Sequence, residues 1–291
     1  MTTVLSAPAR RQQQQLNYRK LLATVATHAV AIAVALCFLL PFAICVLTSV
    51  MTQNQAGTGA LVPSTWAWHN FADVFTAMPF LRDLWNTLLY AGLSTVGVLL
   101  SSVPVAYALS RMWWRGREIM FLVVLGTMMI PAQVTSLPLY VVFSQLGWVD
   151  SLKPLIIPSF FGDAFSIFLL RQFFLTIPPE ITEAARVDGA NDWRILTRVI
   201  IPMTKPAIAA VGLFSFLYAW NDFYNPLLYT GNSSTSQTLA VGLTTLAKSS
   251  HQNAYQLQMA ASIIFLAPVL LIFFFAQKVF VEGVTLTGVK G

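Results

Sequence analysis

The chain has 291 residues, of which 56% are hydrophobic and only 10% are charged, with a formal net charge of +6. Soluble domains carry about 25% charged residues, so this composition excludes an ordinary soluble domain and favours an all-α polytopic membrane protein. The basic residues are scattered along the chain and lie at the ends of apolar runs, a pattern of membrane topology that argues against nucleic acid as a partner.

The apolar runs predict a single membrane domain over residues 19–291, after a solvated, disordered tail over 1–18. A membrane-spanning helix needs about 20 mostly apolar residues. Stretches that meet this requirement predict six transmembrane helices, at 22–50, 86–109, 119–145, 155–175, 204–229 and 258–280. The fourth of them is interrupted by Pro158, Gly162 and Asp163.

Six spans place both termini on one side of the membrane, and the basic residues indicate which side. Of the 17 Lys and Arg residues, all but Arg82, Lys153 and Lys248 fall in segments and helix ends that share a side with the termini. Because cytoplasmic segments carry such an excess, both termini are predicted to be cytoplasmic and the chain to contact membrane lipid throughout.

The sequence offers no material for a metal site or a catalytic centre. Cys37 and Cys45 lie roughly 12 Å apart along the first predicted helix, too far for a disulfide. No Cys and His cluster has the spacing of a metal site. We therefore expect no metal and no catalytic residue in this chain.

A polar insert at 177–202 separates the fourth and fifth apolar stretches. Pro178 and Pro179 suit the first turn of a helix, where no backbone hydrogen bond is lost. Asp188 and Gly189 then supply a stop, since glycine adopts positive φ freely. The first half of the insert is therefore predicted to be a short helix that ends in a sharp turn.

A second short helix is expected in the other half of the insert. Asn191 or Asp192 can cap its amino end, and Pro202 marks its end. An apolar stripe at helical spacing is expected to pack against the membrane domain, and its members are Trp193, Leu196 and Ile200.

This insert resembles the EAA loop of bacterial ABC importer permeases. The family pattern is Glu-Ala-Ala, three residues, Gly, nine residues, Ile, one residue and Leu-Pro. Here the matching elements stand at the same spacing, with Val and Ile as mild replacements in the second half: Glu183-Ala184-Ala185, Gly189, Val199 and Ile201-Pro202.

The resemblance extends over roughly residues 20–291 and is strongest to the carbohydrate branch of the maltose-permease type. It also rests on three further motifs, namely Trp220-Asn221-Asp222 with Pro226, Met129-Ile130-Pro131 with Gln133 and Pro138, and the glycine-containing ending from Gly283 to Gly291.

The resemblance implies a permease subunit of a binding-protein-dependent importer in a bacterial cell membrane. Its implied partners are a second, homologous permease subunit, two cytoplasmic ATPase subunits and an extracytoplasmic solute-binding protein. The first insert helix would contact an ATPase subunit, with coupling carried by Glu183, Ala184, Ala185, Asp188 and Gly189. The sequence has no Gly-x-x-x-x-Gly-Lys-Ser/Thr phosphate loop, so the chain is not expected to be an enzyme, and ATP and Mg would bind to the partner ATPase subunits.

Polar residues inside predicted spans are costly and are candidates for a solute pathway. Asp163 is expected near the membrane midplane, and Trp220, Asn221 and Asp222 in the outer part of the fifth span. Gln133 lies in the third. Sugars bind to planar hydrogen-bonding groups and aromatic faces, which suits these residue types. The same side chains could instead cap broken helices or bond to neighbouring spans.

The sequence thus predicts a permease that couples closure of ATPase subunits to alternating access for a carbohydrate or related polar solute. Movement of Glu183–Asn191 would carry the fourth and fifth spans with it. One rival is a stand-alone secondary transporter or channel that uses Asp163 and Asp222. A second rival is a scaffold or sensor, for which no soluble sensory domain is present. The solute itself stays open among monosaccharides, oligosaccharides, amino sugars and glycerophosphodiesters.

Overall fold

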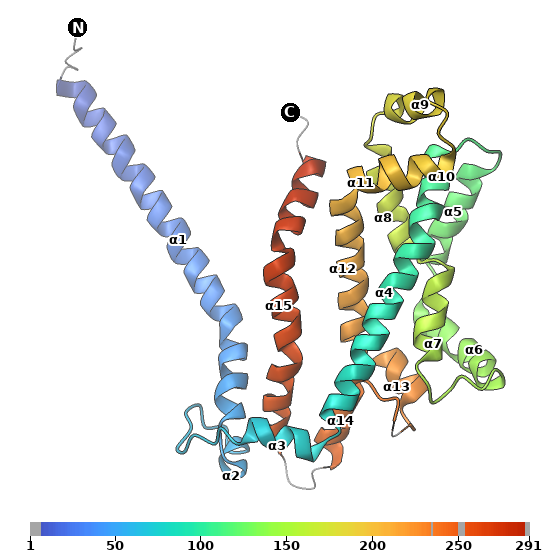
Figure 1. Ribbon diagram of the computed structural model, residues 1–291. Coiled ribbons are helices and arrows are strands. Elements are labelled where there is room, and N and C mark those ends of the chain that lie inside the picture. Colours follow the sequence, from blue (N-terminus) through green and yellow to red (C-terminus); the bar gives the residue numbers. More distant parts are fainter. Residues whose placement is uncertain (1–6, 234, 250–253, 289–291) are drawn as a thin grey trace. The chain divides into compact units, whose positions relative to one another are not determined.

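The computed structural model describes the backbone of residues 7–233, 235–249 and 254–288, and the side chains of 20–233, 235–246 and 254–274. Every regular element in these ranges is helical (Figure 1). The chain forms two compact units, Met1–Phe71 with Asn253–Ile263 and Ala72–Gln252 with Ile264–Gly291. Each unit is described by itself below as unit one and unit two.

Unit one contains the long helix α1, Ala7–Ser49, and the single turn α2, Gln53–Ala56. Most side chains in the apolar part of α1 are exposed, so lipid has to cover them in a membrane. The helix begins at Ala7, although the sequence predicts a disordered tail over 1–18. Ala, Gln and Arg are good helix formers, which the compositional argument for disorder does not take into account. Residues 1–6 lie outside the described residues.

Unit two holds the remaining helices, and two of them, α3 and α15, contribute residues to both units. In chain order the elements are α3 (Asn70–Ala77), α4 (Phe80–Arg111), α5 (Arg117–Thr127), α6 (Ala132–Gln145), α7 (Lys153–Ile156), the 3₁₀ helix η1 (Ile157–Phe161), α8 (Ala164–Leu175), α9 (Pro179–Val187), α10 (Asp192–Ile195), the π-helix η2 (Leu196–Ile200), α11 (Ile201–Met203), α12 (Lys205–Asn221), α13 (Tyr224–Thr230), α14 (Leu239–Ser249) and α15 (Tyr255–Gly288).

The predicted all-α membrane fold is confirmed. Within the described residues, four helical stretches are long and apolar enough to cross a membrane: Lys20–Ser49, Phe80–Arg111, Lys153–Leu175 and Tyr255–Phe274. Two further pairs of helices qualify together, α5 with α6 and the α10–α11 segment with α12, but these are bent by 91° and 82°. All six predicted apolar stretches are therefore found, two of them in bent pairs.

Two predicted spans are less regular than the sequence suggests. The span predicted over 119–145 is broken between α5 and α6, because Pro131 has no backbone N–H and disfavours a helical conformation of the residue before it. The span predicted over 204–229 ends at Asn221, since Asp222 is extended and its carboxylate accepts a hydrogen bond from the Asn225 backbone N–H at 3.2 Å.

Helix α4 is the central element of unit two, and it contacts α7, η1, α8, α12 and α14 (Figure 1). A hydrophobic core at one end joins α4, α8, α12 and the α9–α11 segment. Its fully buried members include Ala106, Leu170, Phe174, Ile195 and Ile200. This core ties the polar insert to three long helices.

Close packing between α4 and η1 depends on Gly97. A Cβ atom at Gly97 would lie 2.5 Å from Ser159 Oγ and 2.7 Å from the Phe160 ring, which is closer than real Cβ contacts. Ser101 Oγ lies within hydrogen-bond distance of both the Ser159 carbonyl, at 3.1 Å, and the Gly97 carbonyl, at 2.8 Å. Small residues at such positions let helix backbones approach closely in membranes.

We predict that Gly97→Ala destabilises the protein by about 1–3 kcal/mol, because the added methyl group has to displace the Ser159 and Phe160 side chains. Gly92→Ala is the matched control in the same helix, since nothing lies within 4 Å of its added Cβ. That variant should be neutral or stabilising by up to about 1 kcal/mol. The free energy of unfolding in detergent would be measured, and equal effects of both changes would contradict the packing role of Gly97.

Candidate functional site

The turn of the polar insert has the geometry that the sequence predicts. Helix α9 ends in a Schellman motif, in which the Ala190 N–H donates to the Ala185 carbonyl at 2.9 Å and the Gly189 N–H to the Arg186 carbonyl at 3.0 Å. Gly189 has a φ of +82°, and Asn191 Oδ1 caps the next helix by accepting from the Arg194 N–H at 2.9 Å. The motif therefore fixes the angle between the two short helices.

The residues predicted to carry coupling divide into two groups. Glu183, Ala184, Asp188 and Gly189 are exposed, whereas Ala185 is half-buried against the core shared with α4, α8 and α12. Val187, in the last turn of α9, is 87% exposed. Helix α9 thus presents small and acidic residues outward and holds Ala185 inward, so a partner could contact it without disturbing its packing.

The buried stripe of the second insert helix differs from the predicted one. Leu196 and Ile200 are buried as expected, but Trp193 is 68% exposed, and Ile195 is fully buried in its place. The π-helix Leu196–Ile200 explains this shift, because its i→i+5 hydrogen bonds bring residues five apart onto one face. Ile195 and Ile200 have this spacing.

Asp192 connects the insert to the end of α4. Its Oδ1 accepts hydrogen bonds from Tyr107 Oη at 3.0 Å and from an Arg186 guanidinium nitrogen at 3.0 Å. The hydrogen bond to Asp192 raises the pKa of Arg186 above its usual value, so this side chain stays protonated. Both halves of the insert are therefore linked to α4 through one carboxylate.

A second link joins α4 to the segment that leads from α8 into the insert. The Arg111 guanidinium donates to the carbonyls of Phe174 and Ile177, and the Arg111 carbonyl accepts from Arg186 at 3.3 Å. The last carbonyls of a helix have no intrahelical partner, and Arg111 supplies one for α8. The end of α8 cannot separate from α4 without loss of these bonds.

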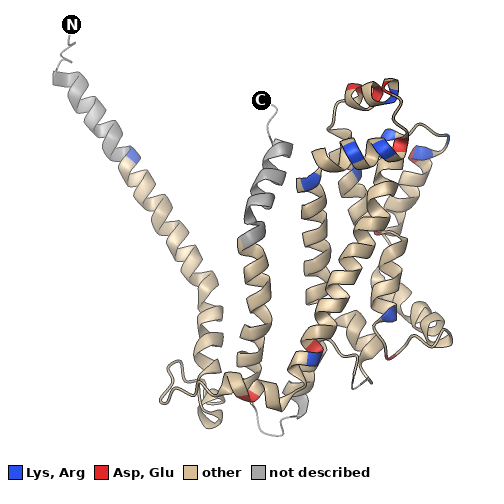
Figure 2. Cartoon of the chain, viewed as in Figure 1, with Lys and Arg blue, Asp and Glu red and all other residues tan. Residues whose placement is uncertain are grey.

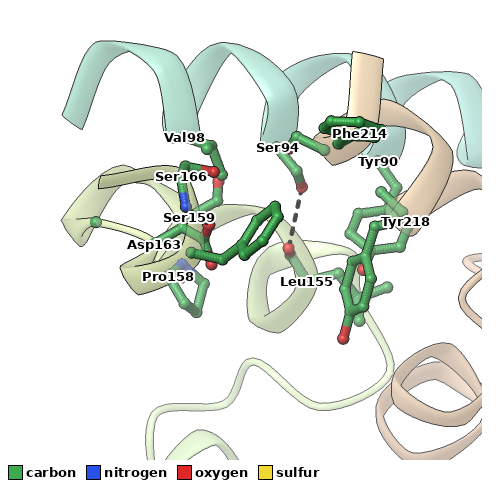
Figure 3. A pocket seen from close by; sticks show the side chains of 14 residues that line it. Tyr90, Ser94, Val98, Leu155, Pro158, Ser159, Asp163, Ser166, Phe214 and Tyr218 are labelled. Atoms are coloured by element: carbon green, nitrogen blue, oxygen red, sulfur yellow. Dashed lines mark hydrogen bonds between the residues drawn. The ribbon is translucent and has the colours of Figure 1, made fainter. Parts of the chain in front are cut away.

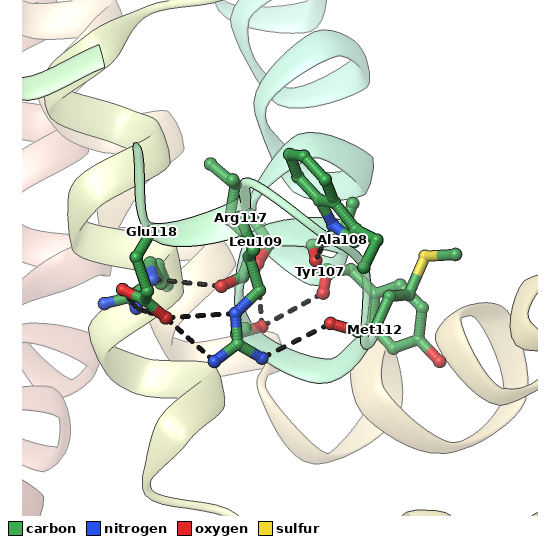
Figure 4. A network of polar contacts seen from close by, with 10 residues as sticks. Tyr107, Ala108, Leu109, Met112, Arg117 and Glu118 are labelled. Carbon is green, nitrogen blue, oxygen red and sulfur yellow. Dashed lines mark hydrogen bonds and ion pairs between the residues drawn. The ribbon is translucent and has the colours of Figure 1, made fainter. Parts of the chain in front are cut away.

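The turn between α4 and α5 is held by a further polar network (Figure 4). Arg171, which is 8% exposed, donates through Nε to the Leu109 carbonyl at 3.1 Å and pairs with Glu118 at 3.1 Å. Its guanidinium also stacks on the Phe121 ring at 3.9 Å. Arg117 pairs with the same Glu118 at 2.8 Å and donates to the Met112 carbonyl. Helices α4, α5 and α8 are joined at this end.

Charged residues gather at this same end of unit two (Figure 2). In the described part of unit two, the α9–α11 segment and the neighbouring helix ends carry most of the basic residues: Arg111, Arg115, Arg117, Arg186, Arg194, Arg198 and Lys205. The opposite helix ends carry Arg82 and Lys153. This asymmetry gives unit two a basic end and a nearly neutral one.

A cavity of about 640 Å³ lies between α4, the broken fourth span and α12 (Figure 3). Its walls combine aromatic rings, hydroxyl groups and one carboxylate, and the residues are Tyr90, Ser94, Val98, Leu155, Pro158, Ser159, Gly162, Asp163, Phe165, Ser166, Phe214, Ser215, Tyr218 and Ala219. Ligand pockets commonly measure about 300–1,000 Å³, so the volume suits a small solute.

Asp163 is the one predicted pathway residue that lines this cavity. It also caps α8, since its Oδ2 accepts a hydrogen bond from the Ser166 N–H at 2.7 Å. Gly162 beside it has a φ of +109°, a conformation that breaks the fourth span and that other residues rarely adopt. Asp163 therefore has the helix-capping role that the sequence allows for it, and its residue also lines the cavity.

The other predicted pathway residues lie outside the cavity lining. Trp220 is fully buried and stacks between Phe216 and Phe265, with ring centroids at 5.7 and 5.4 Å. Asn221 donates to the Leu217 carbonyl of its own helix at 2.8 Å. The exposed Gln133 lies near the amino end of α6. These positions give none of the three a place in the cavity.

Asp222 reaches the cavity indirectly. Its Oδ2 accepts from Tyr90 Oη at 2.7 Å and from Asn225 Nδ2 at 2.9 Å. It therefore joins α4 to the start of α13 and holds the hydroxyl of a residue that lines the cavity.

Several residues of the site were not predicted from the sequence. Tyr107 and Arg111, like Tyr90 and Ser94, stand four apart in α4 and so share a face, which is a signal that the sequence contains. The pairing of Arg186 with Asp192 crosses a turn and follows no helical period. No group of three or more metal-ligating side chains occurs among the described residues.

Comparison with known proteins places the chain among transport permeases. The family model described as "binding-protein-dependent transport system inner membrane component" matches residues 96–286. The arabinooligosaccharide permease AraQ of Bacillus subtilis (strain 168) is 33% identical over 230 residues, 79% of this chain and 81% of that protein. The sn-glycerol-3-phosphate permease UgpE of Yersinia pestis is 30% identical over 264 residues, 88% of this chain and 94% of that protein.

A solved structure agrees with these relatives. A chain of a bacterial ABC transporter for import of the acidic polysaccharide alginate has a TM-score of 0.75 and 27% identity, and the match covers 95% of this chain and 99% of that one. The chain therefore belongs to the family of binding-protein-dependent transport system inner membrane components, which are the membrane permeases of ABC importers.

Proposed function

We propose that this chain is the permease subunit that couples ATP hydrolysis on partner subunits to import of a carbohydrate or related polar solute. The observation that carries the proposal is the two-sided insert. Its outer residues on α9 are exposed, and its inner residues belong to one buried core with α4, α8 and α12. A force applied to α9 would therefore reach three long helices.

The basic end of unit two supports a cytoplasmic position for the insert. Cytoplasmic segments of membrane proteins are enriched in Lys and Arg, and the α9–α11 segment with its neighbouring helix ends carries this enrichment. With six spans, this orientation would place both termini in the cytoplasm as well.

The exposed face of α9 suits an ATPase partner. Glu183 and Asp188 offer negative charge, and Ala184 permits close approach of another protein surface. In this proposal two ATPase subunits bind ATP and Mg, and this chain holds neither. A second permease subunit and an extracytoplasmic solute-binding protein complete the assembly. A solved structure of similar fold, with a TM-score of 0.63 and 20% identity, is an alginate ABC transporter in complex with a pentasaccharide-bound periplasmic protein.

The insert is proposed to transmit the movement of the ATPase subunits to the membrane helices as a rigid element. Asp192 links both of its halves to Tyr107 of α4, and Arg111 links α4 to the end of α8. Closure of the ATPase subunits would move α9, and these bonds would move α4 and α8 together. The cavity between α4, α8 and α12 would then change its access from one side of the membrane to the other.

The carbohydrate class follows from the relatives and from the cavity. AraQ is named for arabinooligosaccharides. Another relative, a permease of Synechocystis that is 33% identical over 222 residues, is named for osmoprotective compounds. Aromatic rings and hydroxyl groups line the cavity of this chain, a combination that suits sugars.

The alternative of a secondary transporter that uses Asp163 and Asp222 has less support. Both carboxylates accept hydrogen bonds that hold helix ends, from Ser166 and Asn225 respectively. A transported ion at either carboxylate would compete with these helix-capping bonds. Uptake that persists without any ATPase subunit would favour this alternative.

We predict that Glu183→Lys lowers ATP-driven solute uptake by at least about tenfold, because it reverses an outward charge where the ATPase would dock. Glu180→Lys is the matched control, since Glu180 is also exposed on α9 but stands in its first turn. Uptake and ATP hydrolysis would be measured on the full complex in proteoliposomes. Unchanged uptake in Glu183→Lys, or an equal loss in both variants, would refute a specific coupling contact.

We further predict that the angle of the insert turn matters for coupling. Gly189→Val places a β-branched residue at a φ of +82°, which should cost about 1–2 kcal/mol and distort the turn. Gly189→Asn should retain most of the uptake, because Asn adopts positive φ more easily. No atom lies within 4 Å of a Cβ at this position, so a clash cannot explain a difference between them. Equal uptake by the two variants would contradict the prediction.

A further inference from the structure

We propose that the cavity between α4, the broken fourth span and α12 is a solute-binding subsite of this chain that takes uncharged, hydroxyl-rich solutes and rejects anionic ones. The inference rests on the proposed function, because it assumes that the chain carries a solute. It adds the side chains that select the solute and the charge that they exclude.

The cavity lies at the depth expected for a transport site. At 1.5 Å per residue, Tyr90 and Val98 lie about 15 and 27 Å along α4 from its start, and Phe214 lies about 14 Å along α12 from its own start. These positions fall in the middle part of a bilayer crossing. Irregular backbone is tolerated at such depth where it is buried in protein or lines a cavity, and Gly162 with Asp163 does line this one.

Three of the six hydroxyl groups in the lining, those of Ser94, Ser159 and Tyr90, are oriented as hydrogen-bond acceptors. Ser94 Oγ donates its proton to the Leu155 carbonyl at 3.1 Å (Figure 3), and Ser159 Oγ donates to the Ile156 carbonyl at 2.6 Å. Tyr90 Oη donates to Asp222 at 2.7 Å. A hydroxyl has one proton and two lone pairs, so each of these oxygens can still accept a bond but has no proton left to donate.

These three oxygens therefore favour a solute that supplies hydrogen-bond donors. Sugar and polyol hydroxyls do so, and the planar rings of Phe165, Phe214 and Tyr218 offer faces for the apolar side of a sugar. Carboxylate and phosphate groups of a solute only accept hydrogen bonds. They would leave the oxygens of Ser94, Ser159 and Tyr90 unpaired, which is costly in a site away from water.

The charge of the cavity lining also disfavours an anionic solute. Asp163 is the one acidic residue among the residues that line the cavity, and none of them is Lys, Arg or His. A negatively charged solute would meet a carboxylate and no compensating cation. The inferred preference differs from the anionic solutes for which UgpE of Yersinia pestis and the alginate transporter are named.

The test compares two disaccharides of similar size, neutral arabinobiose and the dianion digalacturonate. Equilibrium binding of each would be measured to the full transport complex, purified through this chain and free of binding protein. The wild type should bind arabinobiose at least about tenfold more tightly than digalacturonate, a ratio that corresponds to about 1.4 kcal/mol.

Asp163→Asn isolates the charge, because Asn caps a helix as well as Asp does and should leave α8 intact. We expect this variant to have a smaller preference for arabinobiose over digalacturonate than the wild type, with the part due to the acceptor hydroxyls retained. Asp150→Asn is the matched control, since Asp150 is an exposed carboxylate outside the cavity and Asn also tolerates its φ of 62°. It should leave the preference unchanged.

Three results would overturn the inference: digalacturonate binding as tightly as arabinobiose to the wild type, neither sugar binding, or an Asp163→Asn preference equal to that of the wild type. ATP-driven uptake by the complete system with its binding protein is measured in parallel. Absence of ATP-driven uptake would refute the proposed function itself, whereas normal uptake together with any of the three binding results refutes only the subsite.

Discussion

The need to satisfy every backbone polar group without water governs this structure. In a bilayer an unpaired N–H or C=O group is costly, so each break in a helix requires a partner within the protein. Asp163 supplies it at the start of α8, and Asp222 at the start of α13. Arg111 supplies it at the end of α8, through the carbonyls of Phe174 and Ile177. These three polar residues are therefore placed where the backbone requires them.

These backbone partners also carry the features on which transport would depend. The Asp163 that caps α8 brings a carboxylate to the cavity, and the Asp222 that holds α13 fixes the proton of Tyr90. Arg111 closes the end of α8 and accepts Arg186 of the insert through its own carbonyl. Structural and functional roles are combined in single side chains, which suits a protein with only 10% charged residues.

The sequence predicts the local features well and the long-range pairs poorly. The apolar stretches, the stop at Gly189 and the cap at Asn191 depend on neighbouring residues, and each of them is present. The bond between Tyr90 and Asp222 spans 132 positions, and the bond between Tyr107 and Asp192 spans 85. Burial of Ile195 in place of Trp193 follows from a π-helical turn, which no hydrophobic period of 3.6 residues indicates.

The capping geometry of Asp163 has an evolutionary consequence. Asp and Asn are nearly equivalent at the amino end of a helix, and a single nucleotide change converts one codon into the other. A lineage could therefore alter the charge beside the cavity in one mutational step, with α8 still capped and the fold intact. Charge preference for solutes could then drift among related permeases faster than their architecture, because folding imposes no selection against the exchange.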